Sequence, residues 1–220
     1  MKTVKIALAK VVVDETLYPR HKISEGNVNQ LVEALKAGAT FPRIILDEKT
    51  LKVIDGWHRT EAYRKQYGEG VEVDAELHQY ESKQEMLIDA VQRNATQGYK
   101  LTTWDRVRSI IMLQELNAPE EEIRKALGIT EERMESLMNR RVAANGHGGK
   151  IALKGSMESF SGKKLDKKQR KYNDGPGIGV SIHVLLSQII RALEAKAIDK
   201  EDPKIKDRFA RIIELWGAGE

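Results

Sequence analysis

The chain has 220 residues, enough to bury a core in one or two domains, and hydrophobic residues make up 40% of it. It has no cysteine, which excludes disulfides, cysteine-based zinc sites and thiol catalysis. The formal net charge is only +4, so partners must be inferred from where the charge lies. No apolar run approaches a membrane span, and we expect no membrane partner and no secretory leader. These features predict that the protein is located in the reducing cytoplasm, or in the nucleoid within it.

The first half of the chain predicts a small α+β domain. Loose alternation predicts a first strand over 4–13, and an amphipathic pattern predicts a helix over 27–37. Residues 41–46 and 51–54 predict a hairpin, and 71–77 predict a strand with one buried face.

A single glycine, Gly56, separates the strand that ends near Ile54 from a helix predicted over 58–67. Such a junction presents unpaired backbone N–H groups at the start of a helix, a site suited to phosphate. Arg59 adds charged donors in the first turn. The alternative is a strand–helix junction that binds nothing, with Arg59 as an ordinary surface residue. A glycine followed three positions later by an arginine often occurs by chance.

The order Gly56-Trp57-His58-Arg59 resembles the Gly-x-x-Arg box of the ParB/sulfiredoxin-like fold. In ParB proteins this box grips the triphosphate of CTP, and in sulfiredoxins a similar Gly-Cys-His-Arg box grips ATP. The resemblance implies that these four residues bind a nucleotide, CTP or another nucleoside triphosphate. Pro19-Arg20 is also similar to the ParB loop after the first strand.

A second segment lies in a helix that a capping box predicts over 82–94. Its residues Leu-Ile-Asp-Ala-Val-Gln-Arg resemble the ParB segment Leu-Ile-Glu-Asn-Leu-Gln-Arg, which lines the other side of the nucleotide pocket. The resemblance implies that Gln92 and Arg93 close the pocket and that Asp89 reaches a magnesium ion, Mg2+. Ala90 replaces an Asn associated with hydrolysis, so slow CTPase turnover is possible but efficient turnover is not expected. An ordinary amphipathic helix with a polar last turn is the alternative.

The next part of the chain predicts an all-α region. A helix begins near Leu101, with Thr102 or Thr103 as its N-cap. Helices over 120–127 and 130–140, joined at Gly128, match the apolar spacing of a helix-turn-helix. ParB proteins likewise pass from the nucleotide domain into a helical DNA-binding domain.

The candidate DNA contacts in this region are Arg133, Asn139, Arg140 and Arg141. Two features weaken the motif. Arg124 stands where a small residue is usual, and glutamates begin the second helix, where phosphates would approach. A helical hairpin that only packs on its neighbours stays open as an alternative.

Residues 150–172 concentrate positive charge, with eight Lys and Arg residues against Glu158 and Asp166. We predict that they neutralise nucleic-acid phosphates, the alternative being a solvated tail. His147, in the glycine-rich stretch before them, receives no role, and 173–179 predict a turn. The DNA-binding candidates here are Lys163, Lys164, Lys167, Lys168, Arg170 and Lys171.

Two amphipathic helices are predicted over 181–196 and 203–216, with apolar faces too large to leave in water. They pack on each other, on the middle of the chain or across a dimer. The predicted domains are a nucleotide-binding domain, a helix-turn-helix domain, a basic linker and a C-terminal helical hairpin, over 1–100, 101–145, 146–178 and 179–220 respectively.

The resulting hypothesis is a ParB-like DNA-binding protein of the partition or transcription-regulator type, of plasmid, phage or mobile-element origin. It would bind double-stranded DNA and a nucleotide as a homodimer. Sulfiredoxin activity is excluded because Trp57 replaces the catalytic cysteine. A phosphotransferase similar to free-serine kinases, using His58, Asp55 and Glu61 as acid–base groups, is an alternative, as is a nuclease. A DNA-binding protein with a vestigial pocket is the third option.

Overall fold

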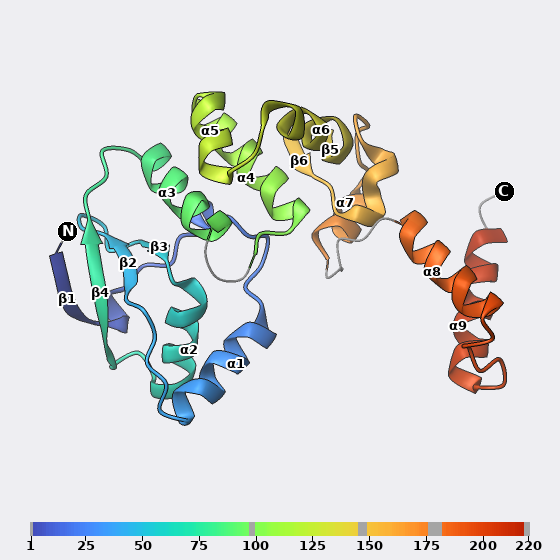
Figure 1. Cartoon of the computed structure of the whole chain (residues 1–220), viewed down its shortest axis with the longest axis horizontal. Coiled ribbons are helices and arrows are strands. Elements are labelled where there is room, and N and C mark those ends of the chain that lie inside the picture. Colours follow the sequence, from blue (N-terminus) through green and yellow to red (C-terminus); the bar gives the residue numbers. More distant parts are fainter. Residues whose placement is uncertain (1, 97–99, 145–148, 176–181, 218–220) are drawn as a thin grey trace. The chain divides into compact units, whose positions relative to one another are not determined.

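The computed structural model describes residues 2–96, 100–144, 149–175 and 182–217 (Figure 1). They divide into two units, 1–179 and 180–220. No helix among these residues is both long and apolar enough to cross a membrane.

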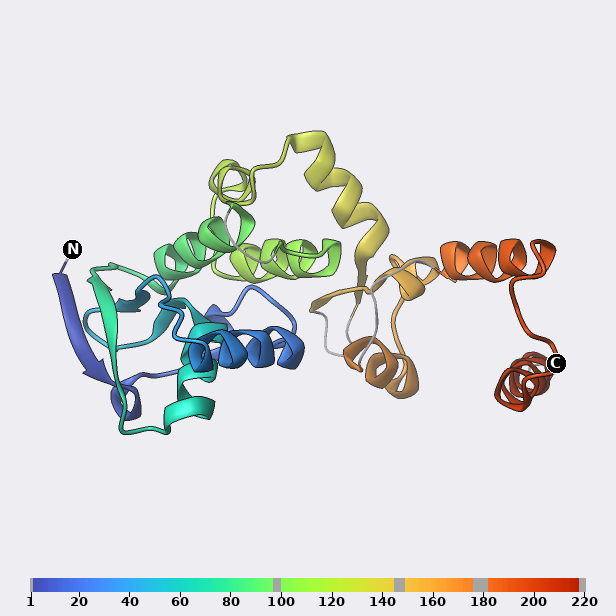
Figure 2. The ribbon, with the colours of Figure 1, turned by 60° about the horizontal axis from the view of Figure 1, so that its bottom comes forward.

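The N-terminal part of the first unit is built on a four-stranded mixed sheet (Figure 2). The strands are β1 (Lys2–Ala7), β2 (Ile44–Asp47), β3 (Val53–Asp55) and β4 (Glu72–His78). Their spatial order is β1-β4-β2-β3, with β4 antiparallel to β1 and parallel to β2. The predicted hairpin is formed by β2 and β3. This small mixed sheet, followed by helices, confirms the predicted α+β class.

The first strand is shorter than predicted. After Ala7 the chain enters a short 3-10 helix, η1 (Leu8–Lys10), and crosses to the opposite edge of the sheet. There the N–H of Val12 donates to the Leu51 carbonyl, and the N–H of Val53 donates to the Val12 carbonyl. The alternation over 4–13 therefore comes from two segments: β1 pairs with β4, and Val12 pairs with the chain around β3. The sequence pattern alone does not separate them. A second 3-10 helix, η2 (Glu15–Leu17), follows.

Two helices, α1 (Glu25–Lys36) and α2 (Trp57–Tyr67), lie side by side (Figure 1). The Ser24 hydroxyl caps α1 by accepting from the Asn27 N–H at 3.3 Å. The apolar stripe of α1 packs against the buried Ala62 of α2. This packing places the first turns of both helices near one end of the sheet.

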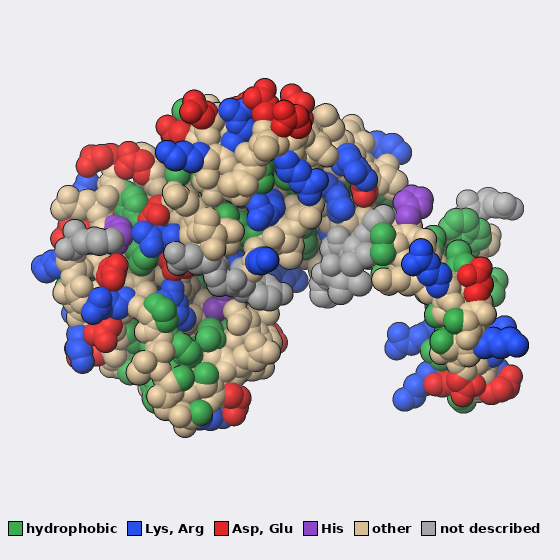
Figure 3. All heavy atoms as spheres, viewed as in Figure 1, with side chains coloured by type: hydrophobic (Ala, Val, Ile, Leu, Met, Phe, Trp, Pro, Cys, Tyr) green, Lys and Arg blue, Asp and Glu red, His purple; other side chains and the backbone are tan. Residues whose placement is uncertain are grey.

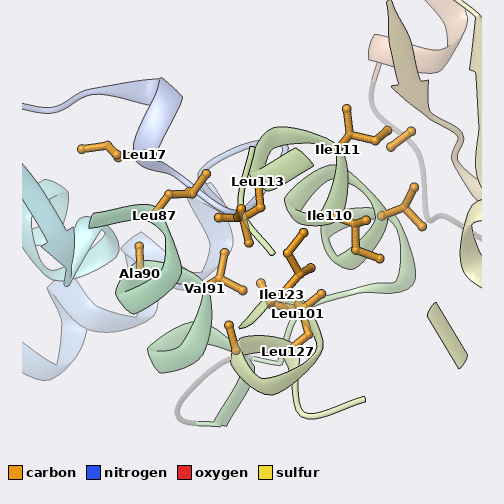
Figure 4. Packing of buried hydrophobic residues seen from close by; sticks show 14 of the residues in the cluster. Leu17, Leu87, Ala90, Val91, Leu101, Ile110, Ile111, Leu113, Ile123 and Leu127 are labelled. Carbon is orange, nitrogen blue, oxygen red and sulfur yellow. The ribbon is translucent and has the colours of Figure 1, made fainter. Parts of the chain in front are cut away.

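The helix α3 (Lys83–Thr96) connects the sheet to three further helices, α4 (Thr103–Glu115), α5 (Glu120–Leu127) and α6 (Glu131–Arg141). One cluster of buried side chains runs from β3 through α3 to α6, and Figure 4 shows its centre. The regions predicted as separate domains, 1–100 and 101–145, therefore share one core. Thr102 is the N-cap of α4 and forms a capping box with Asp105.

The basic linker predicted over 146–178 is wrong for the described part of that segment. This part forms β6 (Lys150–Ala152), a 3-10 helix η3 (Gly155–Phe160) and α7 (Lys167–Asp174), and β6 pairs with β5 (Val142–Ala144), which precedes it. A small core of Ala143, Leu153, Met157 and Leu165 holds these elements together. We call residues 142–144 and 149–175 the basic module. Residues 145–148, with His147, and 176–179 of the predicted turn lie outside the described residues.

The second unit is a pair of helices, α8 (Ile182–Glu194) and α9 (Pro203–Gly217), close to the predicted ranges. No described residue of either helix is buried. Trp216 is 85% exposed and Ile213 is 69% exposed. Two helices with such apolar faces do not make a core by themselves.

Candidate functional site

The strand–helix junction at Gly56 has the geometry of an anion site. Gly56 is the N-cap of α2 and adopts φ 102° and ψ 21°, a left-handed conformation that favours glycine. A Cβ at this position would lie 2.8 Å from Cγ2 of Ile44. The N–H of Thr60 donates to the Gly56 carbonyl, so the N–H groups of the three residues between them have no helical acceptor. They can receive a phosphate or a carboxylate.

A cavity of about 500 Å³ lies beside this junction, a volume typical of small-molecule sites. Four guanidinium groups and two carboxylates face it, so the cavity carries an excess of positive charge. Its lining consists of Tyr18, Arg20, Asn27, Leu31, Pro42, Arg43, Ile45, Asp55, Gly56, Trp57, His58, Arg59, Glu76, Arg93 and Asn94.

Arg59 is the best anchored of these cations. Its Nη1 donates to the carbonyls of Pro42 and Arg43 at 2.6 and 2.8 Å, and its Nη2 donates to Oδ2 of Asp55 at 2.7 Å. These bonds explain why β2 begins only at Ile44, since the two preceding carbonyls turn toward the guanidinium. Arg59 therefore holds the loop before β2 against the first turn of α2. An anion that enters the cavity would compete with the Asp55 carboxylate for the Arg59 guanidinium.

The other guanidinium groups are also oriented by acceptors. Arg20 is buried, and its Nη1 donates to the Lys100 carbonyl at 3.2 Å. Arg43 lies 3.4 Å from Glu76, and Nε of Arg93 donates to Asp89 at 2.8 Å. A guanidinium held in this way loses little side-chain entropy when it binds a phosphate through its remaining N–H groups. Sequence reasoning noted the Pro19-Arg20 resemblance but did not place Arg20 or Arg43 in the site.

Trp57 forms a wall of the cavity rather than an exposed platform. Its ring stacks on that of Tyr18, with centroids 4.3 Å apart and planes inclined by 18°. Its indole N–H donates to the Val53 carbonyl at 3.3 Å. Burial raises the pKa of Tyr18, so its phenol stays neutral and gives the wall no charge.

His58 joins α1 to α2. Its Nε2 accepts the Ser24 N–H at 3.2 Å, which fixes the start of the helix that brings Asn27 and Leu31 to the cavity. Burial, aided by the positive charge of Arg20, lowers the pKa of His58 to about 4. The ring is therefore a neutral acceptor at pH 7 and supports the site instead of exchanging protons with a ligand.

The carboxylates proposed as acid–base groups, Asp55 and Glu61, both form ion pairs with arginines. Asp55 pairs with Arg59 at 2.7 Å, and Glu61 pairs with Arg64 at 2.5 Å. Of these two carboxylates, only Asp55 lines the cavity. The geometry gives the phosphotransferase alternative no free base among its named candidates.

The structure brings only part of the α3 segment to the cavity. Arg93 lines it together with Asn94, which sequence reasoning missed, whereas Gln92 is exposed and lies outside. Leu87, Ala90 and Val91 face the core, and this sets the rotation of the helix. Ala90 is fully buried there, and the expectation of slow turnover stays a prediction.

The magnesium role predicted for Asp89 does not fit its surroundings. One carboxylate oxygen accepts from the Tyr80 hydroxyl at 2.6 Å, and the other accepts from Arg93. Asp89 is not among the residues that line the cavity. Among the described residues, no group of three or more His, Asp and Glu side chains is placed to hold a metal ion. The nuclease alternative therefore has no metal-binding cluster among the described residues, and the binding of Mg2+ with a nucleotide stays a prediction.

The predicted DNA contacts on α6 differ in availability. Arg133 and Asn139 are exposed. Arg140 pairs with Glu158 of η3 at 2.5 Å, and Arg141 approaches the same carboxylate at 3.5 Å with only 16% of its side chain exposed. Both arginines pair with the basic module, but Arg140 keeps 67% of its side chain exposed, so only Arg141 is largely withdrawn from solvent.

The first turn of α6 and the neighbouring α5 carry an acidic surface, visible at the upper edge of Figure 3. Arg124 pairs with Glu131 at 2.5 Å across the α5–α6 turn, which accounts for an arginine where a small residue was expected. Of the residues whose spacing predicted a helix-turn-helix core, Ile129 is half-buried. The others are buried, namely Ile123, Ala126, Leu127, Met134 and Leu137.

The basic module presents its lysines from ordered backbone. Lys163 and Lys164 lie in the turn before α7, and Lys167, Lys168 and Lys171 project from the helix; all are exposed, while Arg170 is half-buried. Asp166 and Gln169 form a capping box at the start of α7.

Lys154 differs from the other lysines of this segment because it is 1% exposed. Its Nζ donates to the Tyr172 carbonyl and lies 3.9 Å from the centre of the Tyr172 ring. It therefore fastens α7 to β6 and adds nothing to the surface charge.

No family model and no curated protein matches the chain. Among solved structures, it is similar to a pNOB8-like ParB N-domain, with 15% identity and a TM-score of 0.44 over 69% of this chain and 57% of that one. It is also similar to C-terminally truncated ParB from Caulobacter crescentus in two complexes. The complex with CTP-gamma-S gives 13% identity and a TM-score of 0.38 over 63% of this chain and 78% of that one. The complex with the centromeric parS site gives 12% identity and a TM-score of 0.45 over 62% of this chain and 70% of that one.

The match thus spans less than two thirds of the pNOB8-like chain. The structures found are of the ParB-like fold that the residues around Gly56 predicted. At such identities the likeness concerns the fold alone and says nothing of ligands.

Proposed function

We propose that the chain is a ParB-like DNA-binding protein, of the partition or transcription-regulator type, whose N-terminal cavity binds a nucleoside triphosphate. The observation that carries the proposal is the convergence of four guanidinium groups and the first turn of α2 on one cavity. A polyanion of fixed size is the ligand that such a set neutralises best.

The chain's own residues divide the work of binding. The N–H groups after Gly56, with Arg59, hold the terminal phosphates, and Arg20 and Arg93, which also line the cavity, neutralise further charge. Asn94 offers amide donors and acceptors that can meet a sugar or a base edge. CTP is the first candidate because the Gly56 box resembles the ParB one.

The basic module supplies the proposed DNA surface. Its exposed lysines on α7 and in the preceding turn neutralise phosphates without reading sequence, so binding should depend steeply on salt. Arg133, Asn139 and Arg140 are the exposed side chains of α6 that are available to contact bases. Such a protein would act at the nucleoid.

A homodimer completes the proposal. The helices α8 and α9 expose Leu186, Ile190, Ile213 and Trp216, and none of their described residues is buried. A second copy of this hairpin would cover both apolar faces. Light scattering of the full chain and of residues 1–179 tests this proposal. We expect the full chain to be a dimer and residues 1–179 to be a monomer. The same number of chains per particle in both samples would reject the homodimer through α8 and α9.

The nucleotide proposal is tested by calorimetric titration of CTP, ATP and GTP into the wild-type chain and into Arg59→Lys. Lysine keeps the charge but loses the fork, so we expect CTP affinity to fall by about tenfold or more. Arg64→Lys is the matched control, because Arg64 lies on the same helix and pairs with Glu61 outside the cavity.

Absence of nucleotide binding by the wild-type chain, with salt-sensitive DNA binding intact, would leave a DNA-binding protein with an unused pocket. Equal affinities of wild type and Arg59→Lys would show that the nucleotide binds elsewhere.

A further inference from the structure

A second cavity, of about 170 Å³, lies in the first unit between α4 and the basic module. One face of α4 forms part of its wall, because positions 104, 108, 111, 112 and 115 follow the helical repeat. Residues of β6 and the end of α7 line it as well. The linings of this cavity and of the cavity beside Gly56 share no residue, so the two are separate places on the chain.

Hydrogen bonds within the chain hold the walls of the second cavity in place. Trp104 stacks on His21, with centroids 3.9 Å apart, and donates its indole N–H to the Ala152 carbonyl at 2.9 Å. The side chain of Asn173, a residue only 2% exposed, donates to the same carbonyl at 2.9 Å. Its Oδ1 accepts the Lys154 N–H at 3.1 Å. The cavity is therefore preformed, and a ligand does not have to order its walls.

Arg108 of α4 lines this cavity without a partner for its charge. Its Nε is buried and makes no hydrogen bond, and among the described residues its guanidinium forms no ion pair. Arg59 and Arg93, by contrast, pair with carboxylates of the chain. A buried donor without an acceptor costs free energy that an incoming acceptor restores. A carboxylate is the small group that fits a free guanidinium fork best.

The other charged groups of the lining lie nearer to solvent. Glu115, Lys150 and Asp174 are exposed, whereas Arg108 is half-buried. Burial lowers the pKa of His21, so its ring is neutral at pH 7. The inner part of the cavity therefore carries the single positive charge of Arg108, and opposite charges are mixed at its mouth.

The volume and the apolar lining limit what can accompany a carboxylate. An apolar cavity of about 150 Å³ holds benzene, so about 170 Å³ accommodates a body of roughly one ring. The cavity beside Gly56, by comparison, measures about 500 Å³. Ile111, Met112 and Ile151 supply apolar surface for such a body.

We propose that the second cavity binds a small monocarboxylate with a compact apolar body of about one ring. The carboxylate meets the Arg108 guanidinium, and the body lies against Ile111, Met112 and Ile151. The ligand contacts α4 and the basic module together, so it stabilises the attachment of the module to α4. The site requires neither a nucleotide nor DNA.

The test uses the full chain and benzoate, which joins one ring to one carboxylate. The chain has three tryptophans, and each reports on a different place. Trp57 lines the cavity beside Gly56, Trp104 lines the second cavity, and Trp216 lies on α9. We expect the indole N–H signal of Trp104 to shift in an NMR titration while the other two stay unchanged, with a Kd of about 1 mM or tighter. Trp→Phe variants assign the three signals.

Related probes on the wild-type chain test the ligand class. Benzyl alcohol keeps the ring without the charge, benzylamine reverses the charge, and acetate keeps the carboxylate without the ring. We expect each to bind at least about fivefold more weakly than benzoate. Equal affinity for benzyl alcohol and benzoate would overturn the proposal, because Arg108 would then not select a carboxylate.

Arg108→Met tests the residue itself, since it removes the guanidinium and keeps an apolar stem of similar length. We expect benzoate affinity to fall by about tenfold or more. Arg191→Met, at an exposed position of α8, is the matched control and should change the affinity by less than about twofold. Equal affinities of wild type and Arg108→Met would reject the site. So would a wild-type titration that moves the Trp57 signal instead of that of Trp104, or that moves none.

Discussion

The cavity and the basic module are both positively charged, but they are built in opposite ways. The cavity uses arginines, and Arg59, with 15% of its side chain exposed, is held by two carbonyls and a carboxylate. The module uses lysines such as Lys167 and Lys168, which extend into water from an ordered helix. Fixed guanidinium forks select a ligand by shape, whereas mobile ammonium groups accept any row of phosphates. Positive charge in the two regions therefore predicts two different kinds of binding.

The largest effect should come from breaking the cavity at its backbone. Gly56→Ala imposes a side chain on a φ of 102° and places its Cβ against Ile44. We expect the free energy of unfolding to fall by about 2–4 kcal/mol and nucleotide binding to be lost. Denaturant unfolding and calorimetry measure the two effects.

Gly128→Ala is the matched control for this substitution. Gly128 is also left-handed, with φ 61° and ψ 45°, but a Cβ there meets nothing within 4 Å. The control substitution should lower the free energy of unfolding by only about 1 kcal/mol, because it introduces backbone strain without a steric contact. It should leave nucleotide binding intact. Equal losses for the two glycines would mean that the contact with Ile44 does not matter.

Charge reversal on α7 should affect DNA binding and spare the cavity. For Lys167→Glu with Lys168→Glu we expect duplex affinity at moderate salt to fall by about tenfold or more, and the slope of log affinity against log salt to decrease by about two. Lys5→Glu with Lys10→Glu makes the same change of charge on exposed residues near β1. If both pairs weaken DNA binding alike, the effect reflects net charge and not the module.

The half-buried histidine of the cavity, His58, should make stability depend on pH. The pKa of His58 is about 4 in the folded chain and near 6.5 when unfolded. Between these values the unfolded chain binds the extra proton, so stability is complete above pH 6.5 and falls as the pH drops toward 4. We expect a loss of about 1–2 kcal/mol, less than the full shift implies because the ring is partly exposed.

Urea unfolding at pH 7 and pH 5 measures this dependence. His58→Gln keeps an acceptor for the Ser24 N–H but does not titrate, so it should flatten the pH profile in part. Burial also lowers the pKa of His21, and that ring contributes the remainder with the same sign. An unchanged profile in His58→Gln would show that His58 is not buried as described.

The smallest effect is expected at Asp89, where the sequence predicted a metal ligand. Because its oxygens accept from Tyr80 and Arg93 outside the cavity lining, Asp89→Asn should change CTP affinity by less than about twofold, with or without Mg2+. Calorimetry in magnesium and in EDTA measures this. A magnesium-dependent loss of tenfold would restore Asp89 to the site.

Local signals in the sequence were sufficient for most helices. Thr102 and Thr130 cap the helices that they were predicted to begin, and the range predicted for α5, 120–127, matches the structure. Gly56 marked the junction because a sharp turn between an apolar strand and a helix requires that residue type. Caps and glycine turns act over three or four residues, so the sequence alone determined them.

Contacts between distant residues decided the rest. The burial of Leu87, Ala90 and Val91 sets the rotation of α3, and this brings Asn94 to the cavity while Gln92 faces solvent and Asp89 turns to Tyr80. The basic module escaped prediction because its core joins Ala143, Leu153 and Leu165 across turns without periodic spacing. Helical and strand periods reveal which residues share a face of one element. Only the tertiary structure decides which faces meet, because that depends on burying apolar area between segments far apart in the chain.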